Sequence, residues 1–284
     1  MGAGLDGVVL MGHGSRDAAA APEFSALADR LAETLGAPVV PGVLEFAGSV
    51  PSIQAAFDCC AALGCRRVAA VPAVLFAGGH ASQDMPRQVA CARARLPWVE
   101  IRAADLVGVD DGLLDCLVER ATAALAGLPP LAPEETALLL VTSGSGRREA
   151  NADVFKAARL LADRAGGRFL VEVAFLRLSR PYLQDAAVRC ARLGARRVVV
   201  VPLFLNTGVL ARRIPRKLVW LRQRLAGVEF VEVPHLGVDP VLVRLLAQRA
   251  REAFTTSRES RVSTPFRLAQ ERCRPVWPRV GVLA

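Results

Sequence analysis

The sequence predicts an α/β protein made of two similar halves, each built on a small parallel sheet flanked by helices. Short apolar, β-branched runs alternate with helical stretches along most of the 284 residues, a pattern typical of parallel sheets that are covered on both faces. The run LGCRRVAAVP at residues 63–72 returns as LGARRVVVVP at residues 193–202, a shift of 130 positions. Gly14-Ser15 and Gly144-Ser145 obey the same shift. The chain therefore contains two copies of one supersecondary unit.

The first copy is predicted to contain four strands that alternate with four helices. We expect strands at residues 8–11, 38–44, 67–75 and 99–103, and helices at residues 22–35, 52–63, 85–95 and 112–126. Three prolines follow the last of these helices and would end it. The sequence thus predicts an N-terminal repeat over residues 1–127 and a linker over residues 128–135.

The second copy repeats this order over residues 136–254. Strands are expected at residues 137–142, 169–175, 197–205 and 229–233, and helices at residues 151–165, 181–193, 210–225 and 240–254. After residue 254 the periodicity stops, and Ser, Thr, Arg and Pro dominate. Residues 255–284 are therefore predicted to form a flexible basic tail.

The composition narrows the class of function. Hydrophobic residues make up 52% of the chain, and no apolar run approaches the roughly 20 residues that span a bilayer. The N-terminus has no basic stretch before its apolar run, so we expect a cytoplasmic protein without a membrane partner. The formal net charge of +9 suits nucleic acid or an anionic small molecule. Few aromatics, at 5%, and no arginine–aromatic alternation favour the small molecule over nucleic acid.

The seven cysteines include no CxxC pair. Their spacing fits neither a zinc site nor a disulfide framework. We interpret them as ordinary thiols of a reducing compartment.

Chemically active residues gather where the predicted strands of the first copy end. His13 follows the first strand, Glu45 the second, and Gly78-Gly79-His80 the third. Parallel sheets bind ligands beyond the carboxyl ends of their strands, so we expect these residues at one edge. A single histidine there is most often structural. Two imidazoles and a carboxylate, beside glycines that let a large ligand approach the backbone, suit a divalent transition metal.

The turn Gly14-Ser15-Arg16-Asp17 has two interpretations. It is either a strand-to-helix connector in which Ser15 or Asp17 caps the helix, or an anion-binding turn at a helix N-terminus. Arg16 is expected to be structural or to face the substrate, not to be catalytic.

Two motifs together resemble a known family. MGHGSRD at residues 11–17, with VPAVLFAGGHASQDMP at residues 71–86, resembles the CbiX/SirB family of sirohydrochlorin chelatases. The second copy is similar to the C-terminal repeat of the long members, through residues 151–153, 180–181 and 204–214. The resemblance covers about residues 5 to 254 and implies a class II chelatase architecture, with a cleft between two similar lobes.

The resemblance also implies roles for the first copy. His13 and His80 would hold the incoming metal, and Glu45 would accept pyrrole protons. Elementary chemistry agrees, because inserting a divalent ion into a free-base macrocycle releases two N–H protons and needs a nearby base. The carboxylate-rich substrate suits a basic protein. Ser15, Arg16, Gly78 and Gly79 are expected to contact it.

The second copy lacks this set. Ser143 stands in the place of His13, Arg177 in that of Glu45, and Leu210 in that of His80. Arginine forks suit carboxylates, so Arg177, Arg212 and Arg213 are predicted to bind the substrate. A solvated helix face is the open alternative for Arg212 and Arg213, as for their neighbours Arg216 and Lys217. His235, after the last strand, is expected to be structural.

We therefore predict a monomeric lyase that inserts Co²⁺ into sirohydrochlorin without an organic cofactor, the metal being a substrate. Three alternatives stay open. The first is a sirohydrochlorin ferrochelatase of siroheme synthesis, because the same ligands suit Fe²⁺. The second is a metal-dependent hydrolase, which would need a further fixed ligand. The third is a non-catalytic tetrapyrrole or metal carrier.

Overall fold

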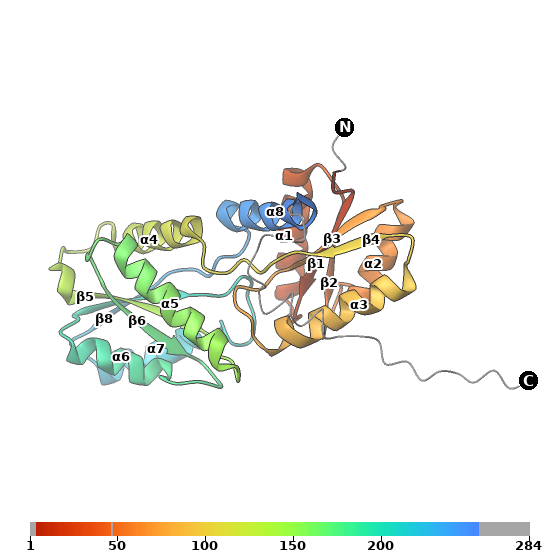
Figure 1. Cartoon of the computed structure of the whole chain (residues 1–284). Coiled ribbons are helices and arrows are strands. Elements are labelled where there is room, and N and C mark those ends of the chain that lie inside the picture. The colour runs from red at the N-terminus through yellow and green to blue at the C-terminus, as the bar shows by residue number, and fades with distance from the viewer. Residues whose placement is uncertain (1–3, 47, 256–284) are drawn as a thin grey trace, which may run out of the picture.

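A computed structural model describes residues 4–46 and 48–255, without the side chain of His80. Its strands form two four-stranded sheets, ordered β2-β1-β3-β4 and β6-β5-β7-β8, in which every pairing is parallel (Figure 1). The predicted α/β class with two similar lobes is confirmed. The strands are β1 (Gly7–Gly12), β2 (Val39–Val43), β3 (Arg67–Pro72), β4 (Glu100–Ala103), β5 (Thr136–Thr142), β6 (Leu170–Phe175), β7 (Arg197–Pro202) and β8 (Glu229–Glu232).

Helices cover both faces of each sheet, which explains why the central strands β1 and β5 are buried along their whole length. Val8 and Leu10 of β1 point into one hydrophobic cluster, whereas Val9 and Met11 point into another on the opposite face, as the two-residue period of a strand requires. The helices are α1 (Ala20–Leu35), α2 (Ile53–Ala62), α3 (Met85–Arg95), α4 (Asp111–Leu125), α5 (Arg148–Arg164), α6 (Leu183–Arg192), α7 (Arg213–Arg224) and α8 (Pro240–Thr255), with a π-turn η1 (His80–Asp84) and a 3₁₀ turn η2 (Pro133–Glu135).

The last helix of each repeat packs on the other lobe. Helix α4 lies against α5, β7 and β8, whereas α8 lies against α1, β3 and β4 (Figure 1). Arg120 on α4 donates to backbone carbonyls of the connection before α8 and pairs with Asp239 at 2.6 Å. Arg249 on α8 contacts the connection before α4 in the same way and pairs with Asp110 at 3.7 Å. Two crossing connections therefore join the lobes, and each is held by the helix that follows the other.

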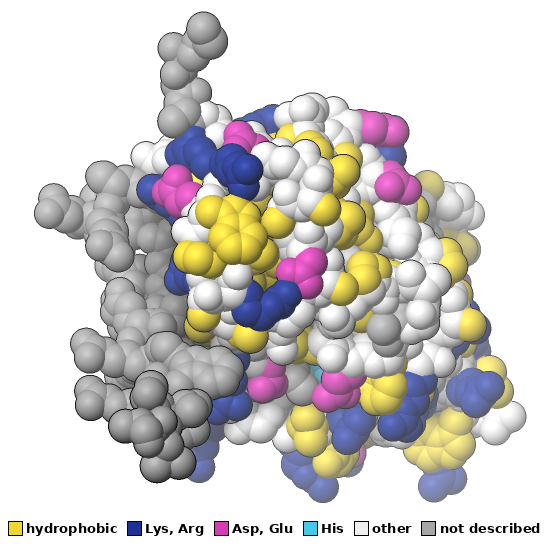
Figure 2. Space-filling view, turned by 90° about the vertical axis from the view of Figure 1, so that its right-hand side faces the viewer, with side chains coloured by type: hydrophobic (Ala, Val, Ile, Leu, Met, Phe, Trp, Pro, Cys, Tyr) yellow, Lys and Arg dark blue, Asp and Glu magenta, His cyan; other side chains and the backbone are white. Residues whose placement is uncertain are grey.

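The predicted basic tail lies outside the described residues, apart from Thr255, which ends α8. In the part of the chain that the structure describes, no helix has the length and apolarity that a membrane span requires. On the outer face of the first lobe, basic side chains are interspersed with acidic and apolar ones (Figure 2).

Candidate functional site

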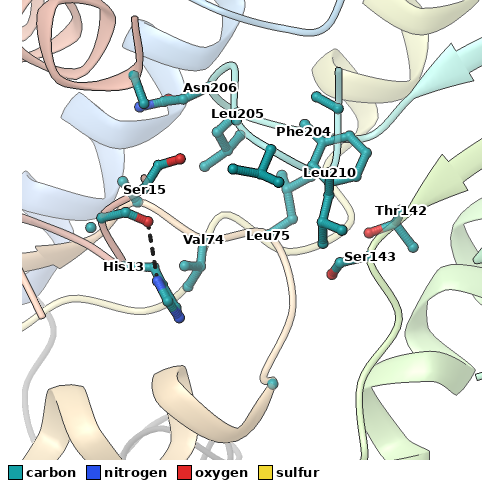
Figure 3. Close-up of a pocket in the computed structure, with 18 of the residues that line it drawn as sticks. His13, Ser15, Val74, Leu75, Thr142, Ser143, Phe204, Leu205, Asn206 and Leu210 are labelled. Atoms are coloured by element: carbon teal, nitrogen blue, oxygen red, sulfur yellow. Dashed lines mark hydrogen bonds between the residues drawn. The ribbon is translucent and has the colours of Figure 1, made fainter. Parts of the chain in front are cut away.

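A cavity of about 950 Å³ lies between the two lobes. Its walls are the turns that follow β1, β2 and β3 in the first lobe and β5, β6 and β7 in the second. Figure 3 shows His13 and Ser15 on one side, Thr142 and Ser143 on the other, and Leu75 and Phe204 between them. The carboxyl ends of both parallel sheets therefore contribute to one site.

The first-lobe wall depends on a glycine that no other residue could replace. His13 directly follows β1, and Gly14 after it adopts φ 90°. A Cβ on Gly14 would lie 1.7 Å from the carbonyl oxygen of Glu45, so only glycine allows the two turns to meet. The Glu45 N–H donates to the His13 carbonyl at 3.0 Å. His13 and Glu45 are thus brought together at one edge of the cavity, as predicted.

His13 is half-buried, and its Nδ1 lies 3.1 Å from the carbonyl oxygen of Gly14 (Figure 3). Glu45 is exposed to the cavity. Because a carboxylate and an imidazole lie on adjacent turns, this wall offers a group that can act as a base and a nitrogen of the kind that ligates transition metals.

The third predicted member of the ligand set is His80, of which the structure describes only the backbone. Gly78 and Gly79 line the cavity, and His80 begins η1, which continues into α3. The Ser82 hydroxyl donates to the Gly78 carbonyl at 2.9 Å and so ties this loop to the π-turn. The side chain of His80 lies outside the described part. Among the side chains that are described, no three His, Cys, Asp or Glu residues are grouped closely enough to hold a metal ion, and the complete ligand set stays a prediction.

The second-lobe wall repeats the same backbone with different side chains. Ser143 follows β5, and Gly144 adopts φ 80°, where a Cβ would lie 2.2 Å from the carbonyl oxygen of Arg177. The Arg177 N–H donates to the Ser143 carbonyl at 2.9 Å. Ser143 and Arg177 therefore occupy the positions of His13 and Glu45.

The two lobes meet across the cavity in a matching pair of contacts. A Cβ on Gly208 would lie 3.4 Å from the Ser15 hydroxyl oxygen, and one on Gly78 would lie 3.6 Å from that of Ser145. The two contacts correspond to each other, because Ser145 and Gly208 lie 130 positions after Ser15 and Gly78. The lobes are therefore arranged with approximate two-fold symmetry. Each Gly-Ser turn supports the third-strand loop of the opposite lobe.

Three of the predicted substrate-binding arginines line the cavity, namely Arg16, Arg177 and Arg213. Arg16 stacks on the Phe46 ring, with its guanidinium carbon 4.5 Å from the ring centre. Arg212 does not belong to the lining and instead pairs with Asp17 of the first lobe. The structure therefore brings two of the three second-lobe arginines to the cavity and places the third in an interlobe contact.

A further interlobe contact centres on Glu23 of α1, which the sequence did not single out. Its carboxylate lies 2.7 Å from Nε2 of His235 and accepts the N–H of Thr207, both from the second lobe. Burial alone would raise the pKa of Glu23, but the hydrogen bonds from His235 and Thr207 bring that pKa below its ordinary value of 4.5. The contact gives His235 a structural role.

Comparisons with known proteins agree with this architecture. The family model CbiX matches residues 7–124 and 137–253, which cover both repeats. A sirohydrochlorin cobaltochelatase from Priestia megaterium is 30% identical over 257 residues, covering 88% of this chain and 80% of that protein. A sirohydrochlorin ferrochelatase from the same organism is 29% identical over 253 residues, with 89% and 92% covered.

Solved structures share the fold. SirB from Bacillus subtilis, determined with Fe³⁺, superposes with a TM-score of 0.74 at 25% identity, covering 88% of this chain and 95% of that one. A CbiX structure described as the terminal enzyme of siroheme biosynthesis in denitrifying bacteria gives a TM-score of 0.60 at 25% identity, covering 88% of this chain and all of that one.

Proposed function

We propose that this chain, which belongs to the CbiX family, is a sirohydrochlorin chelatase that inserts a divalent metal ion into the macrocycle. The observation that carries the proposal is the cavity between the lobes, where His13 and Glu45 lie on one wall and Arg177 and Arg213 on the other. Both relatives compared above carry a sirohydrochlorin chelatase name.

The proposed reaction divides between the two walls. His13, with His80, holds the metal through imidazole nitrogens that leave coordination positions open for transfer. The Glu45 carboxylate accepts pyrrole protons as the metal replaces them. Among the described residues, Arg177 and Arg213 form no ion pair with a carboxylate, and their guanidinium groups are available for the substrate's carboxylates. Ser15, Arg16, Gly78 and Gly79 contact the macrocycle from the first lobe.

The proposed reaction exchanges one metal ion for two protons and needs neither ATP nor an organic cofactor. One chain supplies both walls of the cavity, so we propose that a monomer is active. Cobalt was the metal predicted from the sequence. The two Priestia megaterium relatives, one named for cobalt and one for iron, differ by a single percentage point in identity, and both metals remain candidates because one nitrogen–oxygen ligand set suits either.

An absorbance assay tests the function and the metal together. Purified protein is mixed anaerobically with sirohydrochlorin and, in separate reactions, with Co²⁺, Fe²⁺, Ni²⁺ or Zn²⁺. We expect metallation far above the protein-free rate, with Co²⁺ giving the highest kcat/KM. Tight macrocycle binding without acceleration would identify a carrier instead. A higher kcat/KM for Fe²⁺ would identify a ferrochelatase.

A further inference from the structure

Two residues of the cavity wall share an unusual backbone conformation. Among the described residues other than glycine, only Phe46 and Leu178 have a positive φ, of 50° and 57°. Side chains larger than hydrogen are disfavoured in this left-handed region, particularly bulky ones. Phe46 directly follows Glu45, and Leu178 directly follows Arg177, so the same strained position recurs in both lobes.

Turn geometry accounts for the conformation but not for the choice of residue. The carbonyl oxygens of Glu45 and Arg177 pack against Gly14 and Gly144, and the chain must then bend away. Glycine or asparagine would make that bend with less strain. Both lobes instead place a large apolar side chain there.

These side chains are also exposed. Phe46 is 43% and Leu178 is 65% accessible to solvent, and both line the cavity. An apolar side chain that is both strained and exposed stabilises the folded protein little at that position. Strained residues of this kind are common at ligand-binding sites. This indicates that the side chains of Phe46 and Leu178 contact a ligand.

Each apolar side chain has a cation next to it. The Arg16 guanidinium stacks on the Phe46 ring, which holds it beside the ring. Leu178 follows Arg177, and both also border a smaller depression that Lys217 helps to line. Each lobe therefore presents an apolar surface flanked by positive charge. A flat apolar ring with carboxylates around its rim has the complementary chemistry.

We propose that Phe46 and Leu178 form a two-sided apolar clamp that contacts the ring of the macrocycle from opposite lobes. Arg16 and Arg177 beside them bind carboxylates at its rim. This inference rests on the proposed function and adds the residues that orient the substrate between the metal-holding wall and the arginine wall. Phe46 and Leu178 act here as positioning residues, because the metal and the transferred protons are handled by other groups.

Glycine substitutions separate the clamp from a structural role. In Phe46→Gly and Leu178→Gly the backbone strain is relieved while the apolar contact is lost. We expect the melting temperature to stay the same or rise. The Kd for metal-free sirohydrochlorin, titrated anaerobically by absorbance, should rise about fivefold to tenfold in each variant, since part of an apolar contact is removed. The affinity for Co²⁺ alone should be unchanged.

A matched control uses an exposed leucine of the second lobe outside the cavity. Leu193 caps the C-terminus of α6 at φ −81° and is 55% exposed. Leu193→Gly should leave macrocycle binding unchanged and should not raise the melting temperature. Phe46→Tyr and Leu178→Met, which keep the apolar contact, should bind the macrocycle as the parent protein does.

The outcomes are distinct. If the glycine variants bind sirohydrochlorin as tightly as the parent, the clamp is wrong while the proposed function stands. If a glycine variant does not fold, Phe46→Asn and Leu178→Asn replace it, because asparagine tolerates the left-handed region, and unweakened binding in those variants overturns the clamp equally. If the parent protein itself does not bind the macrocycle, both the clamp and the proposed function are wrong.

Discussion

The turn after β1 and the turn after β5 have the same backbone but opposite chemistry. In both, a positive-φ glycine packs against a carbonyl oxygen of the neighbouring turn, and the same N–H to carbonyl hydrogen bond joins the two. The first turn brings together His13 and Glu45, an imidazole and a carboxylate. The second brings together Ser143 and Arg177, a hydroxyl and a guanidinium. Two side-chain positions therefore separate a wall that can hold a metal from one that can bind an anion.

This comparison shows which part of the repeat the fold requires. The glycines and the backbone hydrogen bond are kept in both lobes because the turns cannot close without them. The side chains that point into the cavity contribute little to that closure, and they differ between the lobes. The proposed function thus depends on positions that the scaffold leaves free.

The largest difference between the lobes should appear on truncating the residue after the first strand. We expect His13→Ala to lower kcat by about 1,000-fold or more, because the metal would no longer be held against the macrocycle. Ser143→Ala, at the equivalent position, should change kcat by about threefold at most. Steady-state metallation rates measure both, and circular dichroism checks that each variant is folded. Similar losses in the two variants would contradict the division between the walls.

The next effect concerns the base. Glu45→Gln keeps the shape of the side chain but cannot accept a proton, so kcat should fall by about 100-fold. Co²⁺ binding, measured by calorimetry, should be partly retained through the imidazoles. A kcat in Glu45→Gln close to that of the parent protein would show that another group is the base.

A smaller effect is expected in the second lobe. Arg177→Ala should raise KM about fivefold to tenfold with little change in kcat, since a charge-assisted contact is lost in substrate binding. Added salt should weaken binding to the parent protein more than to this variant. Arg213→Ala should behave similarly.

Arg212→Ala is the matched control for these substitutions, because Arg212 pairs with Asp17 rather than lining the cavity. It removes the same charge from the same lobe and should raise KM less. An equal rise in KM in Arg212→Ala and Arg177→Ala would show that net charge, not position at the cavity wall, governs substrate binding.

Much of the fold could be predicted because it is encoded locally. Apolar runs such as 137–142 are buried on both faces, and their near-continuous hydrophobicity marks a parallel strand wherever it occurs. Because the chain contains an internal repeat, each strand or helix assigned in one copy supports the assignment of its counterpart in the other copy. The exchange of α4 and α8 could not be predicted in this way, because the apolar face of a helix fits either sheet equally well. Only the packing of the whole chain decides which lobe it covers.

The candidate site could likewise be predicted only in part. His13 and Glu45 could be placed together because the carboxyl ends of parallel strands meet at one edge. The pairing of Arg212 with Asp17 could not, since the two are distant in sequence and each has an ordinary local context. The positive φ of Phe46 and Leu178 could not be predicted from the sequence. Large apolar residues rarely adopt that conformation, so neither residue type points to it. The internal repeat was the available signal, since Phe46 directly follows Glu45 and Leu178 directly follows Arg177, the counterpart of Glu45 in the second copy.

The smallest expected effect concerns the contact by which Glu23 joins the first lobe to the second. Glu23 of α1 holds His235 and Thr207 of the second lobe, whereas Asp153, at the equivalent position on α5, has a shorter side chain. Glu23→Gln should lower the free energy of unfolding by about 1 to 2 kcal/mol at neutral pH, because a hydrogen-bonded charge is lost.

The pKa of Glu23 is lowered in the folded state. The contribution of Glu23 to stability is therefore fully present above the ordinary pKa of 4.5, and it is lost as the pH falls through the lowered folded-state pKa. The difference between parent and variant, measured by urea unfolding from pH 6 to pH 3, should therefore shrink below pH 4.5. Asp153→Asn should lower the free energy of unfolding by less than Glu23→Gln does at neutral pH. A difference for Glu23→Gln that stays constant down to pH 3 would mean that the contact is held by packing rather than by the ionised carboxylate.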